Sequence, residues 1–171
     1  MILIDTGPLV AFFDASDHYH ATCLEILRDL KGPLVTVWPV VTEAFYLLNF
    51  SWKAQDNLWE FLVRGGLEIT DLGQSAVARC RALMKKYRDL PMDLADAALV
   101  AAAETTKLRS VFTLDHKDFS IYRPAHVRRL ELVPAQLVLE ASTGFVLDRQ
   151  RRPCYRLRGV PARGESFQQC C

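Results

Sequence analysis

The segment Ile2-Leu3-Ile4-Asp5 decides the fold class of this 171-residue chain. Three consecutive apolar residues are typical of a strand that is covered on both faces, as strands of a parallel sheet are. Gly7 and Pro8 follow directly and are expected to end the strand. Comparable segments recur four times, as LVTVW (34–38), LEIT (67–70), SVFT (110–113) and RLELV (129–133).

Segments with apolar residues at helical spacing separate these strands. The predicted helices start at Ser16 or Asp17 and run to Leu30, start again at Pro39, and then span 51–63, 74–88 and 92–104. Strands that alternate with helices favour an α/β fold with a parallel sheet. We therefore expect three α/β/α layers around a central parallel sheet of about five strands.

Composition excludes several classes of protein. The chain is 50% hydrophobic, too apolar for a disordered protein, yet no apolar run reaches the ~18–20 residues of a membrane span. The first ten residues lack a basic segment and carry Asp5, so no signal peptide is expected. The five cysteines show no zinc-site spacing. These features predict a cytoplasmic protein with no membrane partner.

The net charge of +1 hides a division of the chain. Residues 1–137 hold 15 Lys and Arg against 17 Asp and Glu, whereas residues 138–171 hold 6 against 3. The second segment is also rich in Pro, Gly and Arg. We therefore expect a domain over 1–137 and a basic C-terminal extension over 138–171, either flexible or forming a short hairpin.

Acidic residues follow the predicted strands. Asp5 ends the first strand, Asp115 comes just after the fourth, and Glu43 lies in the helix that follows the second. Ligands of open parallel sheets bind at the carboxyl ends of the strands, where the strand order reverses. Asp93 and Asp96 lie three residues apart at a helix start, so both can project from one side. These acids are expected to meet at one edge of the sheet.

Taken singly, most of these acids have a structural explanation. Asp5 and Asp118 can cap turns, Glu43 suits the first turn of a helix, and Asp93 suits an N-cap. Asp96 is different because it interrupts an apolar helix face, where an unpaired carboxylate is costly. As a set, oxygen ligands without Cys or His favour a hard cation such as Mg²⁺ or Mn²⁺, which promotes phosphodiester hydrolysis.

The chain resembles the PIN-domain family, and within it the VapC-like toxins of bacterial toxin–antitoxin pairs. The resemblance runs from Met1 to about Pro134 and rests on four motifs in order: LIDTGPLVAFFD (3–14), TEAFYLL (42–48), LPMDLADAALVAAAE (90–104) and VFTLDHKDF (111–119). It implies the α/β/α fold expected above and a metal-dependent endoribonuclease that cleaves RNA.

Matched motif by motif, the resemblance implies an acidic quartet that is catalytic and holds Mg²⁺ or Mn²⁺, made of Asp5, Glu43, Asp96 and Asp115. Many relatives have Asn at the last of these positions. Thr6 and Thr113 would hold a water or a phosphate. Asp93 would join the site or only cap its helix, and Asp118 would support the ligands from behind.

The resemblance also implies partners. These are the RNA substrate, a small antitoxin whose C-terminal segment covers the acidic cleft, and a second copy of the chain in a homodimer. Basic residues near the cleft would offset phosphate repulsion, and His116, Lys117 and Arg109 are candidates for binding substrate. Aromatic residues of the early helices either form an interface groove or pack the core: Phe12, Phe13, Trp52, Trp59 and Phe61.

Other functions compete with that of a toxin. A dehalogenase-like phosphatase needs a second acid two residues after its nucleophilic Asp, and here Gly7 follows Asp5-Thr6, so that motif fails. A solitary RNA-processing PIN nuclease and a non-catalytic PIN binding module remain open. The intact acidic set favours an enzyme over the binding module.

Overall fold

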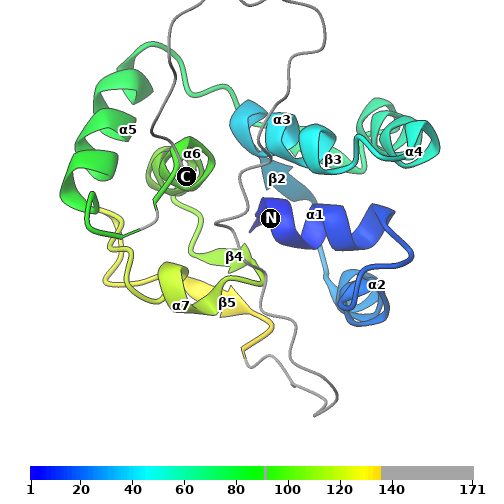
Figure 1. Cartoon of the computed structure of the whole chain (residues 1–171). Coiled ribbons are helices and arrows are strands. Elements are labelled where there is room, and N and C mark those ends of the chain that lie inside the picture. The colour runs from blue at the N-terminus through cyan, green and yellow to red at the C-terminus, as the bar shows by residue number, and fades with distance from the viewer. Residues whose placement is uncertain (91, 136–171) are drawn as a thin grey trace, which may run out of the picture. The chain divides into compact units, whose positions relative to one another are not determined.

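The short apolar segments form a five-stranded parallel sheet in the computed structural model, which describes residues 1–90 and 92–135 (Figure 1). The strand order is β3-β2-β1-β4-β5, and every neighbouring pair is parallel. The strands are β1 (Ile2–Ile4), β2 (Leu34–Thr36), β3 (Leu67–Ile69), β4 (Ser110–Phe112) and β5 (Glu131–Val133). The fold class predicted from the sequence is therefore confirmed, whereas the predicted extension and hairpin beyond residue 137 lie outside the described residues.

Helices cover both faces of the sheet, as right-handed crossovers between parallel strands require. They are α1 (Thr6–Phe13), α2 (His20–Asp29), α3 (Trp38–Leu47), α4 (Trp52–Val63), α5 (Ser75–Lys86), α6 (Leu94–Thr106) and α7 (His116–Phe119). In Figure 1, α1, α2 and α4 lie to the right of the sheet, and α5 and α6 lie to its left. No helix among the described residues has the length and hydropathy to cross a bilayer.

Two helices were not predicted from the sequence, and one begins later than expected. Gly7 and Pro8 end β1 but lie in the first turn of α1, where Pro is tolerated because its missing N–H needs no partner there. Helix α7 has only four residues, too few to show periodicity. Helix α2 starts at His20, because Asp17 instead folds back on the Tyr19 N–H in a turn.

Helix α6 lies at the centre of the molecule. Residues 95–103 are all buried, and seven of the nine are Ala or Val, whose small side chains allow neighbouring elements to approach closely. Helix α5 packs along it on one side and α3 on another. Because α6 has almost no exposed surface over this length, its position is fixed on several sides, and with it the position of the acids at its N-terminus.

The strand order places a switch point beside β1. The chain moves from β1 through β2 to β3 in one direction, and then crosses back to add β4 on the other side of β1. Crossovers in opposite directions leave a crevice at the carboxyl ends of β1 and β4. The sequence prediction that these two strands are neighbours is confirmed by their pairing, with Leu3 opposite Val111 and Ile4 opposite Phe112.

Candidate active site

Asp5 lies at the end of β1 and is the N-cap of α1. Its Oδ1 accepts a 2.8 Å hydrogen bond from the Thr6 backbone N–H, and its Oδ2 accepts one of 2.8 Å from the hydroxyl of Thr113. The side chain is only 2% exposed. A buried carboxylate needs hydrogen-bond donors, and here Thr113, just past β4, provides one from the neighbouring strand. Asp5 is therefore held in a fixed orientation at the switch point.

Glu43 reaches the same edge from α3. The Thr6 hydroxyl donates a 2.6 Å hydrogen bond to Glu43 Oε2, and Glu43 itself is partly exposed. Helix α3 begins at Trp38, directly after β2, so Glu43 lies in its second turn and not in the first turn that the sequence suggested; α3 packs against α1. Thr6 thus joins Glu43 to the residue that follows Asp5.

The residues after β4 continue this arrangement. The Asp115 backbone N–H donates to the Thr113 hydroxyl at 2.9 Å, and Asp115 Oδ1 accepts from the Asp118 backbone N–H at 3.0 Å as the N-cap of α7. Asp118 is buried at 4% exposure. Hydrogen bonds therefore connect Glu43, Thr6, Asp5, Thr113 and Asp115 in sequence across α3, α1, β1 and β4.

Asp93 and Asp96 form a capping box at the start of α6. Asp93 Oδ1 accepts from the Asp96 backbone N–H at 2.9 Å, and Asp96 Oδ2 accepts a longer 3.4 Å contact from the Asp93 N–H. Asp93 is partly exposed, whereas Asp96 is 2% exposed. The two acids therefore lie together, with Asp93 as the cap and Asp96 directed into the interior.

Tyr122 was not predicted from the sequence. It is fully buried, and its hydroxyl donates a 3.1 Å hydrogen bond to Asp96 Oδ2. Burial raises the pKa of Tyr122 far above its usual value, and the carboxylates of Asp96, Asp118 and Asp115 raise it further. The hydroxyl is therefore a permanent donor that orients Asp96. It lies in a short loop without periodicity, so no sequence pattern distinguished it.

The site can hold a hard cation by its donor chemistry. All the predicted metal ligands are carboxylates, and the other polar side chains beside them are the hydroxyls of Thr6 and Thr113. Sets of oxygen ligands suit Mg²⁺ and Mn²⁺. Within 1–90 and 92–135, however, no three His, Cys, Asp or Glu side chains stand close enough together to form a ready-made metal site. The ligand set predicted from the sequence therefore stays a prediction.

The predicted substrate-binding residues lie at different ends of β4. His116 and Lys117 begin α7 beside Asp115, and Lys117 is exposed. His116 Nε2 is buried without a hydrogen-bond partner among the described residues. Arg109 instead precedes β4, about 13 Å along the strand from Thr113 at ~3.3 Å per residue. Arg109 thus does not flank the carboxylates, contrary to the sequence prediction that placed it near the cleft.

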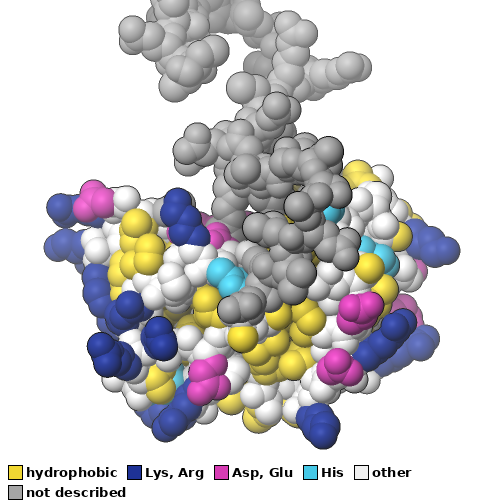
Figure 2. Space-filling view, turned by 90° about the horizontal axis from the view of Figure 1, so that it is seen from below, with side chains coloured by type: hydrophobic (Ala, Val, Ile, Leu, Met, Phe, Trp, Pro, Cys, Tyr) yellow, Lys and Arg dark blue, Asp and Glu magenta, His cyan; other side chains and the backbone are white. Residues whose placement is uncertain are grey.

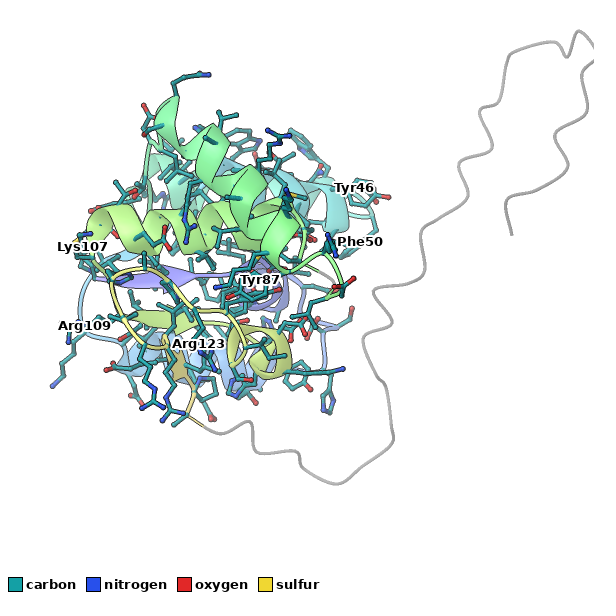
Figure 3. The ribbon with its side chains drawn as sticks, turned by 90° about the vertical axis from the view of Figure 1, so that its left-hand side faces the viewer. Tyr46, Phe50, Tyr87, Lys107, Arg109 and Arg123 are labelled. Atoms are coloured by element: carbon teal, nitrogen blue, oxygen red, sulfur yellow. The ribbon has the colours of Figure 1, made fainter. Side chains whose placement is uncertain are left out.

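The aromatic residues of the early helices divide into two groups. The rings of Phe12, Phe13 and Phe61 pack against one another with centroids 4.6–5.7 Å apart, which favours a core role. On α4, Trp52 is 71% exposed and Trp59 43% exposed. Tyr46 and Phe50 also point outward, at the opposite side of Figure 3 from Lys107 and Arg109. The second group therefore places apolar side chains at the surface.

Comparison with known proteins gives consistent results. A family model described as PIN domain matches residues 2–124. Ribonuclease VapC26 of Mycobacterium tuberculosis is 31% identical over 135 residues, which is 78% of this chain and 100% of that protein. The crystal structure of Mycobacterium tuberculosis VapC20, a sarcin-ricin loop cleaving toxin, matches with a TM-score of 0.67 at 18% identity, over 75% of this chain and 99% of that one. A toxin–antitoxin complex from Klebsiella pneumoniae matches with a TM-score of 0.59 at 19% identity, over 80% and 98%.

Proposed function

Because the chain belongs to the PIN-domain family, we propose that it is a metal-dependent endoribonuclease and the toxin of a toxin–antitoxin pair. The observation that carries this proposal is the row of hydrogen-bonded residues from Glu43 through Thr6, Asp5 and Thr113 to Asp115, in which Thr6 and Asp115 also take part through their backbone N–H groups. Such a row, at the switch point of a parallel sheet, is suited to phosphodiester chemistry.

Each acidic residue has a part in this proposal. Asp5, Asp96 and Asp115 would hold Mg²⁺ or Mn²⁺, with Thr113 orienting Asp5 and Tyr122 orienting Asp96. The bound ion would supply a reactive water and neutralise charge on the phosphate oxygens. Glu43 is partly exposed and fixed by Thr6, so it would position the attacking water on the open side.

The remaining residues of the site would assist these acids. Asp93 caps α6 and keeps the backbone of Asp96 in place. Asp118 would support Asp115 from within α7. His116 and Lys117 would contact the phosphate beside the scissile bond, at the exposed end of the row.

We further propose that a small antitoxin and a second copy of the chain cover the exposed apolar surfaces. One is a groove of about 880 Å³ between the start of α3, α5 and α6, where Trp38, Val77 and Leu94 are 53–62% exposed. Another is the group at the end of α3 and on α4 that includes Phe50 and Trp52. The similarity to a toxin–antitoxin complex supports the antitoxin, and a cytoplasmic location would suit both the RNA substrate and this partner.

The division into a nuclease domain at 1–137 and a basic extension at 138–171 remains part of the proposal. The matched family model covers residues 2–124, and VapC26 aligns over 135 residues, a length close to that of the first segment, which supports this division. Cleavage by a chain truncated after residue 137 would show whether the first segment is sufficient.

The decisive experiment is cleavage of a mixed RNA pool by the full chain with Mn²⁺, with EDTA, and by the variant Asp5→Asn. We expect cleavage with Mn²⁺, none with EDTA, and a loss of at least about 100-fold in Asp5→Asn. The carbonyl oxygen of Asn can still cap α1, and its amide can donate to the Thr113 hydroxyl in place of the bond that Asp5 accepts, so the thermal melt should change little. Normal activity in Asp5→Asn would reject the site.

Two further outcomes separate the toxin from its alternatives. Binding of RNA without cleavage under any metal would indicate a non-catalytic module. Cleavage by a protein that never co-purifies with a small neighbour-encoded protein would indicate a solitary RNA-processing nuclease.

A further inference from the structure

A basic hollow lies at the amino ends of β4 and β5, away from the carboxylates. It has a volume of about 630 Å³ and is lined by Arg109, Arg123, His126, Val127, Arg128, Arg129 and Glu131. We call it the arginine hollow. Arg109 immediately precedes β4 and Glu131 begins β5, so the hollow opens at the edge of the sheet opposite the candidate active site. Figure 3 labels Arg109 at the left-hand margin of the molecule and Arg123 nearer the middle of the view.

Within the part of the chain that the structure describes, the arginines of the hollow have no ion-pair partner. Elsewhere in the described chain Arg79 pairs with Glu104 at 2.6 Å and Arg64 pairs with Glu60 at 2.8 Å. None of the four arginines of the hollow forms an ion pair within 1–90 and 92–135, and the hollow contains a single carboxylate, Glu131. Like charges gathered in a cleft repel one another and raise the local concentration of anions. The charge pattern therefore favours an anionic ligand.

The segments that carry the arginines are held in place by hydrogen bonds. The His126 ring hydrogen-bonds the Leu108 carbonyl at 2.7 Å, and the backbone N–H of Arg123 donates to the Tyr87 hydroxyl at 2.8 Å. The Glu131 N–H donates to the Arg109 carbonyl at 2.8 Å. A pre-organised cluster loses less entropy on binding than mobile surface arginines do. The hollow thus has the rigidity of a binding site.

His126 adds a second unsatisfied group. A carbonyl only accepts, so the Nε2 that faces Leu108 carries the proton. Its Nδ1 is buried and has no hydrogen-bond partner among the described residues.

The catalytic edge itself explains why such a hollow is needed. Without a bound cation, buried Asp5, Asp96 and Asp118 repel phosphate, so a cationic surface elsewhere would add to the affinity for RNA. In Figure 2, Lys and Arg side chains gather along the left-hand side, the side turned to the viewer in Figure 3. Resting on the function proposed above, we propose that the arginine hollow binds backbone phosphates of the RNA substrate, separately from the place of cleavage.

The test compares two charge-matched double variants of the full chain. Arg128→Ala with Arg129→Ala removes two charges from the hollow, and both residues are at least partly exposed, so the fold should persist. The control, Lys53→Ala with Arg64→Ala, removes two exposed charges from α4 and the residue that follows it. Helix α4 lies against β3, the outer strand on the side of the sheet away from β4 and β5. Binding of a fluorescein-labelled RNA hairpin is followed by anisotropy in EDTA, from about 0.05 to 0.3 M KCl, roughly the salt range where phosphate contacts are resolved.

The association constant for RNA falls with salt, and loss of two phosphate contacts should make the slope of its logarithm against log salt less steep by about 1.4 to 1.8. Binding at ~0.1 M KCl should weaken about tenfold or more. The α4 double variant should change RNA affinity less than about twofold, since the proposal assigns no phosphate contact to Lys53 or Arg64. Arg109→Gln, which keeps most of the side-chain volume, should lower the slope by about half as much as the hollow double variant. Equal slopes in the two double variants would overturn the proposal.

Other arms identify the ligand. If the hollow variant loses binding of inorganic pyrophosphate but keeps its RNA affinity, the hollow holds a small phosphate compound and the RNA assignment is wrong. The RNA assignment is equally wrong if the variant loses only an acidic protein partner. The unaltered chain distinguishes failure of the proposed function from failure of the hollow's role. If it neither binds nor cleaves RNA, the proposed function is refuted. If it cleaves RNA and the hollow variant keeps the same salt slope, only the role of the hollow is refuted.

Discussion

The carboxyl ends of the strands carry buried acidic residues, whereas the amino ends of β4 and β5 carry exposed arginines. At the carboxyl edge, Asp5 and Asp96 are each 2% exposed and are held by donors from neighbouring elements. At the amino edge, the arginines lie on the surface and none of them forms an ion pair within the described chain, although Glu131 also lines the hollow. Buried acids require accurate placement, since their desolvation must be offset by hydrogen bonds or a cation. The arginines of the hollow remain exposed and act on anions at longer range, while the segments that carry them are held by hydrogen bonds.

Under the proposed function, the two edges would have different roles. A cation held by these carboxylates would act only within a few ångströms, so the chemistry would take place at the carboxyl edge. Attraction of a polyanion is additive over contacts and can be supplied from anywhere along its path. Changes at the carboxyl edge should therefore reduce the rate of cleavage, and changes at the amino edge should reduce affinity.

Asp96→Asn should have the largest effect and is the most direct way to break this comparison. We expect cleavage to fall at least about 100-fold, with RNA affinity in EDTA unchanged, because the charge is lost but the shape is kept. Cleavage rates at saturating RNA and anisotropy titrations measure the two quantities. Asp89→Asn, at a side chain that is 90% exposed beside Arg88, is the matched control and should leave both unchanged. If Asp96→Asn cleaves RNA at the normal rate, Asp96 has no part in the reaction.

Tyr122→Phe should have an intermediate effect, because it removes a donor rather than a ligand. Loss of the hydroxyl frees Asp96 Oδ2 from its 3.1 Å hydrogen bond. Groups that orient metal ligands typically contribute about 10- to 100-fold in metal affinity or activity. We expect the Mn²⁺ concentration for half-maximal cleavage to rise by such a factor.

A merely structural role for Tyr122 would give a different result. Its ring packs against Phe119 at 5.3 Å and Tyr87 at 5.2 Å, and Phe preserves these contacts. Tyr87→Phe serves as the control, since it removes a hydroxyl that accepts from the Arg123 N–H but does not touch Asp96. Equal Mn²⁺ requirements in both variants would show that Tyr122 acts only through packing.

The sequence was sufficient for the sheet and insufficient for its shortest helices. Apolar runs such as Ile2–Ile4 and the periodicity of α4, capped by Ser51 as expected, reflect burial that is averaged over many residues. Helix α1 was missed because Pro8 reads as a breaker, although in a first turn it is compatible with a helix. Helix α7 has four residues, which is about one turn, so no periodicity exists to detect.

The site could be predicted only where the sequence carried an unusual residue. Asp96 stood out as an acid on an apolar helix face, and Asp5 and Asp115 as acids at strand ends. Tyr122 gave no signal, because its importance comes from a contact with Asp96 across 26 positions of the chain. Arg109 was placed wrongly for a related reason: residue type identifies a charge, but only the direction of β4 shows which end of the sheet carries it.

Glu104→Gln should have the smallest effect and would sharpen the comparison by showing an acid that serves the fold alone. Glu104 lies toward the other end of α6 from Asp96 and accepts hydrogen bonds from Arg79 at 2.7 and 2.6 Å and from the Ala125 N–H at 2.7 Å. It thereby fixes the loop that leads into the arginine hollow. We expect the variant to lose about 1 kcal/mol of unfolding free energy at pH 7, with cleavage at saturating RNA retained.

The pH dependence of this loss tests its electrostatic origin. Burial alone would raise the pKa of Glu104, but the hydrogen bonds from Arg79 and Ala125 outweigh it and lower the pKa below its usual value. The ionised carboxylate therefore stabilises the fold above about pH 4.3, the usual value, and this contribution is lost as the pH falls through the lowered pKa. Thermal melts of the two proteins should differ by about 2–4 °C near neutrality and converge in acid. Glu60→Gln, which breaks the exposed pair with Arg64, should shift the melt less at every pH, and an equal shift would mean that burial gives Glu104 no special role.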